Sequence, residues 1–157
     1  MTPPRRYSEA FVAFVKAGEG FRPTANLDPA GYGQIGYGHK LAPTDPLRTA
    51  TLTTAGGEAL LREDLDKNAC YLCASIPCAF PNLTQGQFDA LVDFVYNEGI
   101  GEFDHSHLRE LVIAGKLDEV PAELDKWVFA GKPPRVMHGL EHRRAGEVSL
   151  WKRVEPA

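Results

Sequence analysis

Residues 19–39 carry the sequence Glu-Gly-Phe-Arg-Pro-Thr-Ala-Asn-Leu-Asp-Pro-Ala-Gly-Tyr-Gly-Gln-Ile-Gly-Tyr-Gly-His, in which two acidic residues precede a glycine-rich segment. Glu19 follows residues 7–18, whose apolar side chains recur at helical spacing, and the glycines beside it favour the end of that helix. Asp28 follows nine residues later, in an Asp-Pro-Ala-Gly sequence typical of a turn. The alternation of apolar residues and glycines after it predicts short strands joined by tight turns.

Two carboxylates brought together across a cleft are the minimum that hydrolysis of a glycosidic bond requires. The negative end of the helix dipole disfavours a second negative charge there and therefore favours the protonated form of the Glu19 carboxyl. The glycines of residues 31–38 lack the Lys-Ser/Thr ending of a phosphate loop. Tight turns and the close approach of a sugar chain explain them better.

The rest of the chain is predicted to be mainly helical. A long helix is expected over about 53–74, and Thr84-Gln-Gly-Gln87 has the form of a capping box that opens a strongly apolar helix through Tyr96. Residues 97–101 are expected to form a loop. Further helices are expected at about 105–114, 118–130 and 140–152, with Trp127 and Trp151 as large core residues.

These elements predict an α+β fold that is mainly helical, in a single domain over residues 1–157. We expect a small N-terminal lobe at about 14–53 with a short antiparallel sheet, a connecting helix at about 53–74, and a helical C-terminal lobe at about 75–157. A groove between two lobes suits a long polymer better than a small metabolite.

Composition and charge restrict the partners. The net charge of −4 argues against nucleic acid as the main partner, although residues 126–153 are locally basic. The sequence contains no stretch of 18 apolar residues, so we do not expect it to insert into a membrane. The apolar run at residues 11–15 is too short for a signal peptide, so we expect a protein made in the cytoplasm that reaches the outside of the membrane through another factor.

Two further features are given structural interpretations. The cysteines, Cys70, Cys73 and Cys78, are too few for a usual zinc site and are expected to be reduced thiols, with a local disulfide through Cys78 as the alternative. Ser106 lies beside two histidines and Asp104, but such close neighbours cannot form a catalytic triad, so an N-terminal helix cap is expected.

The segment quoted above resembles the signature of phage-type (T-even phage) lysozymes, glycoside hydrolase family 24, at Glu19-Gly20, Asp28, Gly31 and residues 35–39. Three later segments resemble the family in the same order, so that the similarity covers about residues 7–152. They are residues 88–99, with an Asn-x-Gly turn, then Trp127, and then Gly139-Leu140 with Arg143-Arg144.

The resemblance implies a lysozyme-like fold and a muramidase, most simply an endolysin, that hydrolyses the β-1,4 bond between N-acetylmuramic acid and N-acetylglucosamine with inversion. It implies Glu19 as general acid and Asp28 as the carboxylate that stabilises the positive charge at the sugar carbon and helps to activate water. It also implies action on the cell wall as a monomer without a cofactor or metal. The candidate substrate-binding residues are Gly36, Tyr37, Asn97 and Arg135.

Two positions of the glycine-rich segment need separate interpretation. His39 is expected to be structural, paired with a carboxylate that holds the sheet. Gln34 stands where the family usually has a catalytic Thr. Its amide can still hold the attacking water, but it is longer than Thr. The alternatives are therefore a weakened enzyme, a non-catalytic peptidoglycan-binding or tail-associated module of the same fold, and a lytic transglycosylase, which needs one acid.

Overall fold

The computed structural model describes residues 3–27, 32–77 and 79–153. They form two compact units, one over residues 9–67 and the other from residue 68 onward together with the N-terminal residues up to Ser8. The fold is α+β and mainly helical, with a small antiparallel sheet, as the sequence predicted. The predicted organisation as one domain with lobes at about 14–53 and 75–157 stays a prediction.

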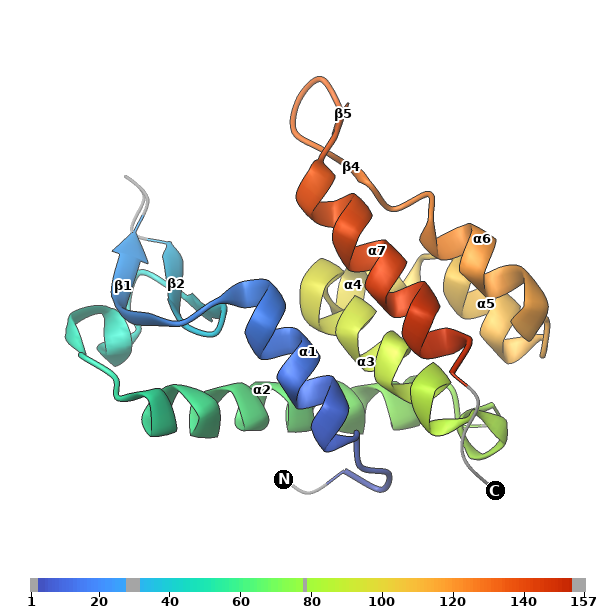
Figure 1. Ribbon diagram of the computed structural model, residues 1–157, viewed down its shortest axis with the longest axis horizontal. Coiled ribbons are helices and arrows are strands. Elements are labelled where there is room, and N and C mark those ends of the chain that lie inside the picture. The colour runs from blue at the N-terminus through green and yellow to red at the C-terminus, as the bar shows by residue number, and fades with distance from the viewer. Residues whose placement is uncertain (1–2, 28–31, 78, 154–157) are drawn as a thin grey trace. The chain divides into compact units, whose positions relative to one another are not determined.

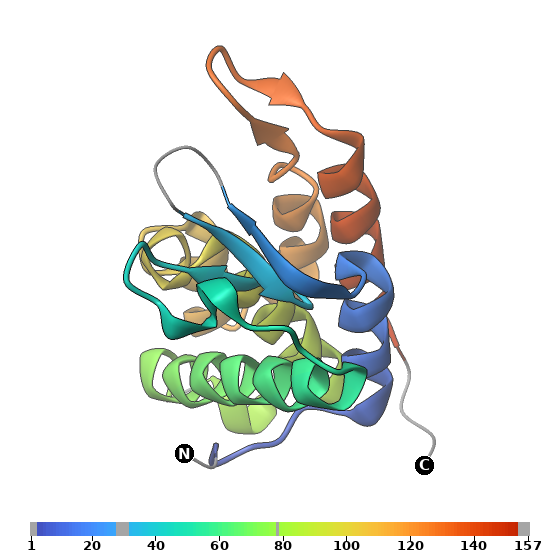
Figure 2. The ribbon, with the colours of Figure 1, turned by 90° about the vertical axis from the view of Figure 1, so that its left-hand side faces the viewer.

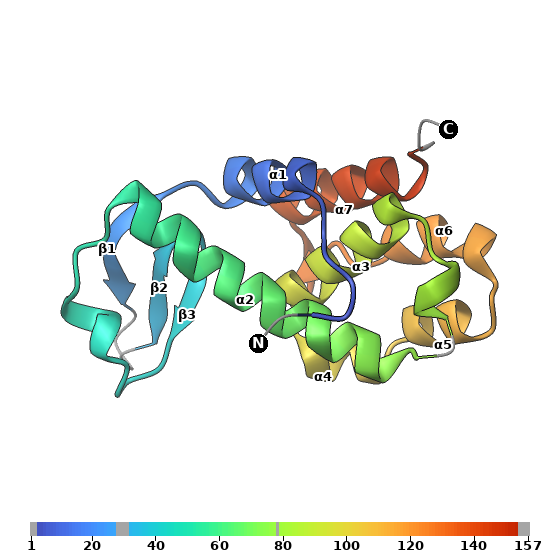
Figure 3. The same ribbon diagram turned by 90° about the horizontal axis from the view of Figure 1, so that it is seen from below.

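The first unit combines two helices with the sheet. Helix α1 (Glu9–Glu19) leads into strands β1 (Arg22–Leu27), β2 (Gly33–Gly36) and β3 (His39–Leu41), which are antiparallel and lie in this order (Figure 2). A short 3-10 helix, η1 (Pro46–Thr49), follows the sheet, and α2 (Thr54–Ser75) runs from this unit into the second (Figure 3). The predicted long helix at 53–74 is therefore confirmed.

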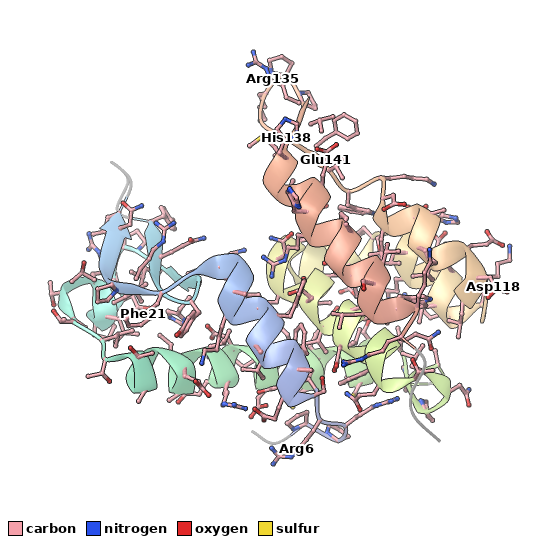
Figure 4. All side chains as sticks on the ribbon, in the orientation of Figure 1. Arg6, Phe21, Asp118, Arg135, His138 and Glu141 are labelled. Atoms are coloured by element: carbon pink, nitrogen blue, oxygen red, sulfur yellow. The ribbon has the colours of Figure 1, made fainter. Side chains whose placement is uncertain are left out.

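The packing of the sheet onto α2 depends on a glycine. A Cβ atom added at Gly57 of α2 would lie 2.5 Å from the Phe21 ring, so only glycine lets this ring lie directly on the helix. Figure 4 shows the Phe21 side chain beside α2. The same ring contacts Tyr37, with ring centroids 5.3 Å apart. The aromatic pair thus fixes the end of the β1–β2 hairpin near the first turns of α2.

The second unit is helical apart from one hairpin. Its elements are η2 (Phe80–Asn82), α3 (Gln85–Glu98), α4 (Ile100–Asp104), α5 (His107–Ile113), η3 (Leu117–Glu119), α6 (Val120–Leu124), the hairpin of β4 (Phe129–Ala130) and β5 (Arg135–Val136), and α7 (His138–Trp151). The capping box at Thr84 is confirmed, because its side chain accepts from the Gln87 amide and the Gln87 side chain accepts from the Thr84 amide. Ser106 caps α5, as predicted.

Helices α3 and α7 lie side by side at the centre of this unit (Figure 1). Their backbones meet at Gly86, where an added Cβ atom would lie 2.1 Å from the carbonyl oxygen of Leu150. Phe88, Leu91 and Phe94 of α3 are fully buried. The absence of a side chain at Gly86 therefore lets α3 and α7 approach closely at this point.

The first residues of the chain pack on α3. Residues 3–8, here called the N-terminal strap, end at Ser8, whose Oγ and amide N lie 2.5 and 3.1 Å from the Asp89 carboxylate oxygens. The guanidinium of Arg5 lies over the Phe88 ring, 5.0 Å from its centroid. Asp89 is 1% exposed, so these contacts supply hydrogen bonds to a buried carboxylate.

Two predictions of local structure are wrong. The expected loop at 97–101 is short, because α4 begins at Ile100 and buries Phe103 completely. The expected helix at 118–130 ends at Leu124, and the chain then forms the β4–β5 hairpin. Trp151 is buried as expected, whereas Trp127 is only half-buried. In the described part of the chain no helix, α2 included, combines the length and apolarity needed to cross a membrane.

Candidate active site

Glu19 lies where helix α1 meets the sheet. It is the last residue of α1 and is half-buried. Gly20 has φ 69°, a left-handed conformation that turns the chain out of the helix at little cost for glycine. Arg22, three residues after Glu19, pairs with Gly36 of β2. The register thus places the backbone of Glu19 near the C-terminal end of β2. Asp28 lies outside the described residues.

Gln34 occupies the middle of the sheet. It pairs with Asn26 of β1 on one side and Lys40 of β3 on the other. Directly paired residues of antiparallel strands point to the same face, so these three side chains form one row across the sheet. Ile35, the next residue of β2, is completely buried on the opposite face. Gln34 therefore lies on the outward face.

A pocket of about 600 Å³ lies over this row. Its lining combines amides, an ammonium group and apolar surface, from Asn26, Leu27, Tyr32, Gly33, Gln34, Lys40 and Leu41. Tyr32 is 56% exposed and offers an open aromatic surface. A few polar groups within a largely apolar concave surface are typical of sites that bind small organic groups, sugar rings included.

Gly36 and Tyr37 lie behind the outward face. Tyr37 is only 6% exposed, and the ammonium group of Lys16 lies 5.4 Å from its ring centroid. The Lys16 Nζ is also 2.5 Å from the Glu58 carboxylate, and this hydrogen bond raises the pKa of Lys16. Gly36 has φ 66°, and an added Cβ atom would lie 3.5 Å from Leu52. The surroundings of both residues are those of packing and turn positions.

His39 has the carboxylate neighbour that a structural role requires. Its Nδ1 is 2.6 Å from Oδ2 of Asp64 on α2, and its Nε2 is 3.8 Å from the Asp45 carboxylate. The hydrogen bond with Asp64 is the main cause that raises the pKa of His39. Because His39 lies on β3 and Asp64 on α2, the pair ties the sheet to the helix.

The second unit holds a separate pocket of about 350 Å³. It is lined by Asn97, Ala130, Met137, Gly139, Leu140 and Arg143. The Asn97 side-chain oxygen accepts a hydrogen bond from Arg144. Arg135 lies on strand β5, and Figure 4 shows it at the tip of the β4–β5 hairpin, away from the helices of its unit.

Ion pairs beneath this pocket were missed by sequence reasoning. Arg143 donates two hydrogen bonds, of 2.7 and 2.8 Å, to the completely buried Asp93. Arg144, 1% exposed, lies 3.0 Å from Glu147 and 3.2 Å from Glu98. Burial, followed by the negative charge of Asp93, raises the pKa of Glu147 well above its usual range. In the sequence, only the Arg144–Glu147 pair has a local signal, because these two residues are three positions apart on one helix.

The candidate residues therefore fall into two groups. Glu19, Gln34, Gly36, Tyr37 and His39 belong to the first unit, and Asn97 and Arg135 belong to the second. Sequence reasoning did not single out Asn26 or Lys40, although both line the pocket with Gln34. Their positions on neighbouring strands become evident only from the register of the sheet.

Proteins of known sequence and structure are similar to this chain over most of its length. The family model described as phage lysozyme matches residues 16–147. An endolysin of Bacillus phage PZA is 32% identical to 95% of this chain, which covers 56% of that protein. An endolysin of Acyrthosiphon pisum secondary endosymbiont phage 1 is 34% identical, and the match covers 92% of this chain and 97% of that protein.

A solved structure is also similar to this chain in fold and sequence. The muramidase domain of SpmX from Asticaccaulis excentricus has a TM-score of 0.85 and 34% identity, over 96% of this chain and 99% of that chain. The chain spans about half the length of the first curated relatives that it matches.

Proposed function

Because the chain belongs to the phage lysozyme family, we propose that it is a muramidase that hydrolyses peptidoglycan. The bond cut is the β-1,4 bond between N-acetylmuramic acid and N-acetylglucosamine. The observation that carries the proposal is the pocket over the outward row of the sheet, which Gln34 lines. Gln34 lies on strand β2, and this strand runs toward the C-terminal end of α1, where Glu19 lies. A glycosidase requires a carboxylic acid within reach of the bound sugar, and Glu19 is the acid that the register places at the end of this strand.

The proposed mechanism assigns one role to each of three residues. Glu19, the last residue of α1, is the general acid that protonates the leaving oxygen. Asp28 stays ionised, stabilises the positive charge at the sugar carbon and helps to activate water. Gln34 holds the attacking water through its amide. Inversion of the anomeric carbon requires the two carboxyl groups to be about 6.5–9.5 Å apart.

Asn97 and Arg135 are proposed to bind substrate from the second unit. Asn97 lines the 350 Å³ pocket, so its side-chain amide lies where polar groups of the glycan would bind, whereas the guanidinium of Arg143 in the same pocket is held by Asp93. Arg135 is exposed on the β4–β5 hairpin. Gly36 and Tyr37 are proposed to support the sheet from behind, with Tyr37 available to substrate only at its exposed edge.

We place the action of the protein at the bacterial cell wall, in keeping with relatives named endolysins. Other relatives are named SAR-endolysins, and the matches to two of them cover 85% of this chain. We also propose that another factor releases the protein to the cell wall and that the protein acts there as a monomer.

The decisive experiment compares Glu19→Gln with the parent protein on purified Gram-negative cell walls. We expect the release of new reducing ends to fall about 100- to 10,000-fold, the range for loss of a general acid. Glu63→Gln is the matched control, because Glu63 is an exposed glutamate of the same unit. Clearing of the walls that survives Glu19→Gln would contradict the mechanism.

The identity of Gln34 favours testing one alternative, a weakened or non-catalytic wall-binding module. If the parent protein binds walls without releasing sugar ends, and Gln34→Thr restores release, the alternative is correct. If both proteins release ends, the alternative is wrong, and a rate that also stays unchanged in Gln34→Ala would contradict the role of Gln34 in holding the water. Mass spectrometry of the products separates a hydrolase from a lytic transglycosylase, because only the latter forms an anhydro sugar.

A further inference from the structure

We propose that Lys40 makes the pocket over the sheet a subsite for a carboxylate carried by the muramyl residue of the glycan. The inference rests on the proposed muramidase function and names which sugar of the alternating chain this pocket prefers. It starts from the row of Asn26, Gln34 and Lys40, in which each side chain is the direct cross-strand neighbour of the next.

The row is chemically asymmetric. Asn26 and Gln34 offer amides, which both donate and accept hydrogen bonds, whereas Lys40 offers three donors and a positive charge. Leu27, Tyr32 and Leu41 supply the apolar part of the lining. A sugar ring presents C–H groups on its faces and polar groups at its edge, so this lining can hold the ring while Lys40 receives an anionic substituent.

The charge of Lys40 is available for such a group. Lys40 is exposed and lies beside Gln34 in the pocket. Among the residues that the structure describes, no ion pair or hydrogen bond of its side chain is found. Lys16, the other lysine near the sheet, is held by Glu58. Lys40 is therefore the lysine of this pocket whose charge the described residues do not neutralise.

The two sugars of peptidoglycan differ in the relevant group. N-acetylglucosamine is neutral, whereas N-acetylmuramic acid carries a lactyl ether that ends in a carboxylate, either free or joined to a stem peptide that has carboxylates of its own. An ammonium–carboxylate hydrogen bond is stronger than one between neutral groups. Both sources present the same chemistry to Lys40, and the substrates of the test separate them.

A competing explanation is that Lys40 protects the edge of the sheet. Strand β3 is an edge strand, and lysine on an edge strand discourages pairing with other chains. That role predicts a change in aggregation but no change in the preference among glycans. The test therefore measures discrimination between charged and neutral substrates.

Binding is measured by calorimetry in the Glu19→Gln background, so that the glycan stays intact. The ligands are peptide-free glycan strands, peptide-bearing strands, and peptide-free strands whose carboxylates are converted to methylamides. We expect Lys40→Met to weaken binding about tenfold for a carboxylate-bearing ligand and to leave the methylamide unchanged. Lys40→Arg keeps the preference, and Lys116→Met, an exposed lysine of the second unit, is the matched control.

The ligand that loses affinity identifies the source of the carboxylate. If Lys40→Met loses affinity for peptide-free strands, the carboxylate bound by Lys40 is that of the lactyl group. If it loses affinity only for peptide-bearing strands, the carboxylate belongs to the stem peptide. Equal affinity of Lys40→Met and its parent for all three ligands overturns the inference. Failure of the unmodified protein to release sugar ends contradicts the muramidase proposal instead, and the binding comparison still decides the role of Lys40.

Discussion

Replacing Asp64 with Asn tests the tie between the sheet and α2. The His39 and Asp64 side chains are 16% and 15% exposed, and their 2.6 Å contact is therefore largely shielded from solvent. A hydrogen bond to a charged group contributes about 1.5–3 kcal/mol. We expect Asp64→Asn to reduce the free energy of unfolding by about 2 kcal/mol, which lowers Tm by about 4–8 °C in a chain of this size.

The effect has a defined pH dependence. Because the folded-state pKa of His39 is raised, chiefly by Asp64, the pair stabilises the folded protein fully below the unfolded-state pKa of about 6.5. This stabilisation is lost as the pH rises through the folded-state pKa. The difference between the parent protein and Asp64→Asn is thus largest near pH 6 and narrows in alkaline solution, where a neutral hydrogen bond remains.

Urea unfolding followed by circular dichroism between pH 5.5 and 9.5 measures this difference. Asp64 also lies 3.4 Å from Lys67, whose side chain is 66% exposed. The control Lys67→Met is therefore expected to cost at most about 0.5 kcal/mol. A difference that stays constant or widens as the pH rises would refute the assignment of the stabilisation to charged His39.

Three further predictions concern the second unit. Gly86→Ala is expected to reduce the free energy of unfolding by about 1–3 kcal/mol in urea unfolding, because its Cβ would lie 2.1 Å from the Leu150 carbonyl oxygen. This overpacking exceeds the gain of about 1 kcal/mol from the higher helix propensity of alanine. The control is Gly139→Ala, whose added Cβ would have no atom within 4 Å and which should be neutral or stabilising. Arg144→Ala leaves the buried Glu147 without its cation and should reduce the free energy of unfolding by about 3 kcal/mol or more by the same measurement, and a change below about 1 kcal/mol would contradict it. Ser106→Ala removes the cap of α5 and should lower stability by about 1 kcal/mol, with faster amide exchange in its first turn; unchanged exchange would show that the cap is dispensable.

Local signals in the sequence were sufficient for several elements. The capping box at Thr84 and the cap at Ser106 depend on residues three positions apart, and a sequence displays such spacings directly. The expected end of α1 at Glu19 is confirmed for the same reason, because the helical spacing stops at the glycines there. Short-range rules therefore located the elements that carry Glu19 and Gln34.

Features that depend on distant residues were not predictable in this way. His39 was expected to have a carboxylate partner, but its identity, Asp64, follows from contact between β3 and α2. Helix α4 was missed because two glycines surround Ile100, whereas burial of Phe103 outweighs their low helix propensity. The neighbours of Gln34 required the register of three strands. Asp28 remains a sequence-based prediction.

The N-terminal strap has a consequence for the order in which the chain matures during synthesis. Ser8 emerges from the ribosome long before Asp89, its partner 81 residues later, whereas residues 9–67 of the first unit are contiguous. We therefore expect the contacts of the first unit to form early and the second unit to fold last, around the strap that precedes the first unit in the sequence. Contacts of such long sequence separation slow folding. A tag or truncation that displaces the strap would act on this final step.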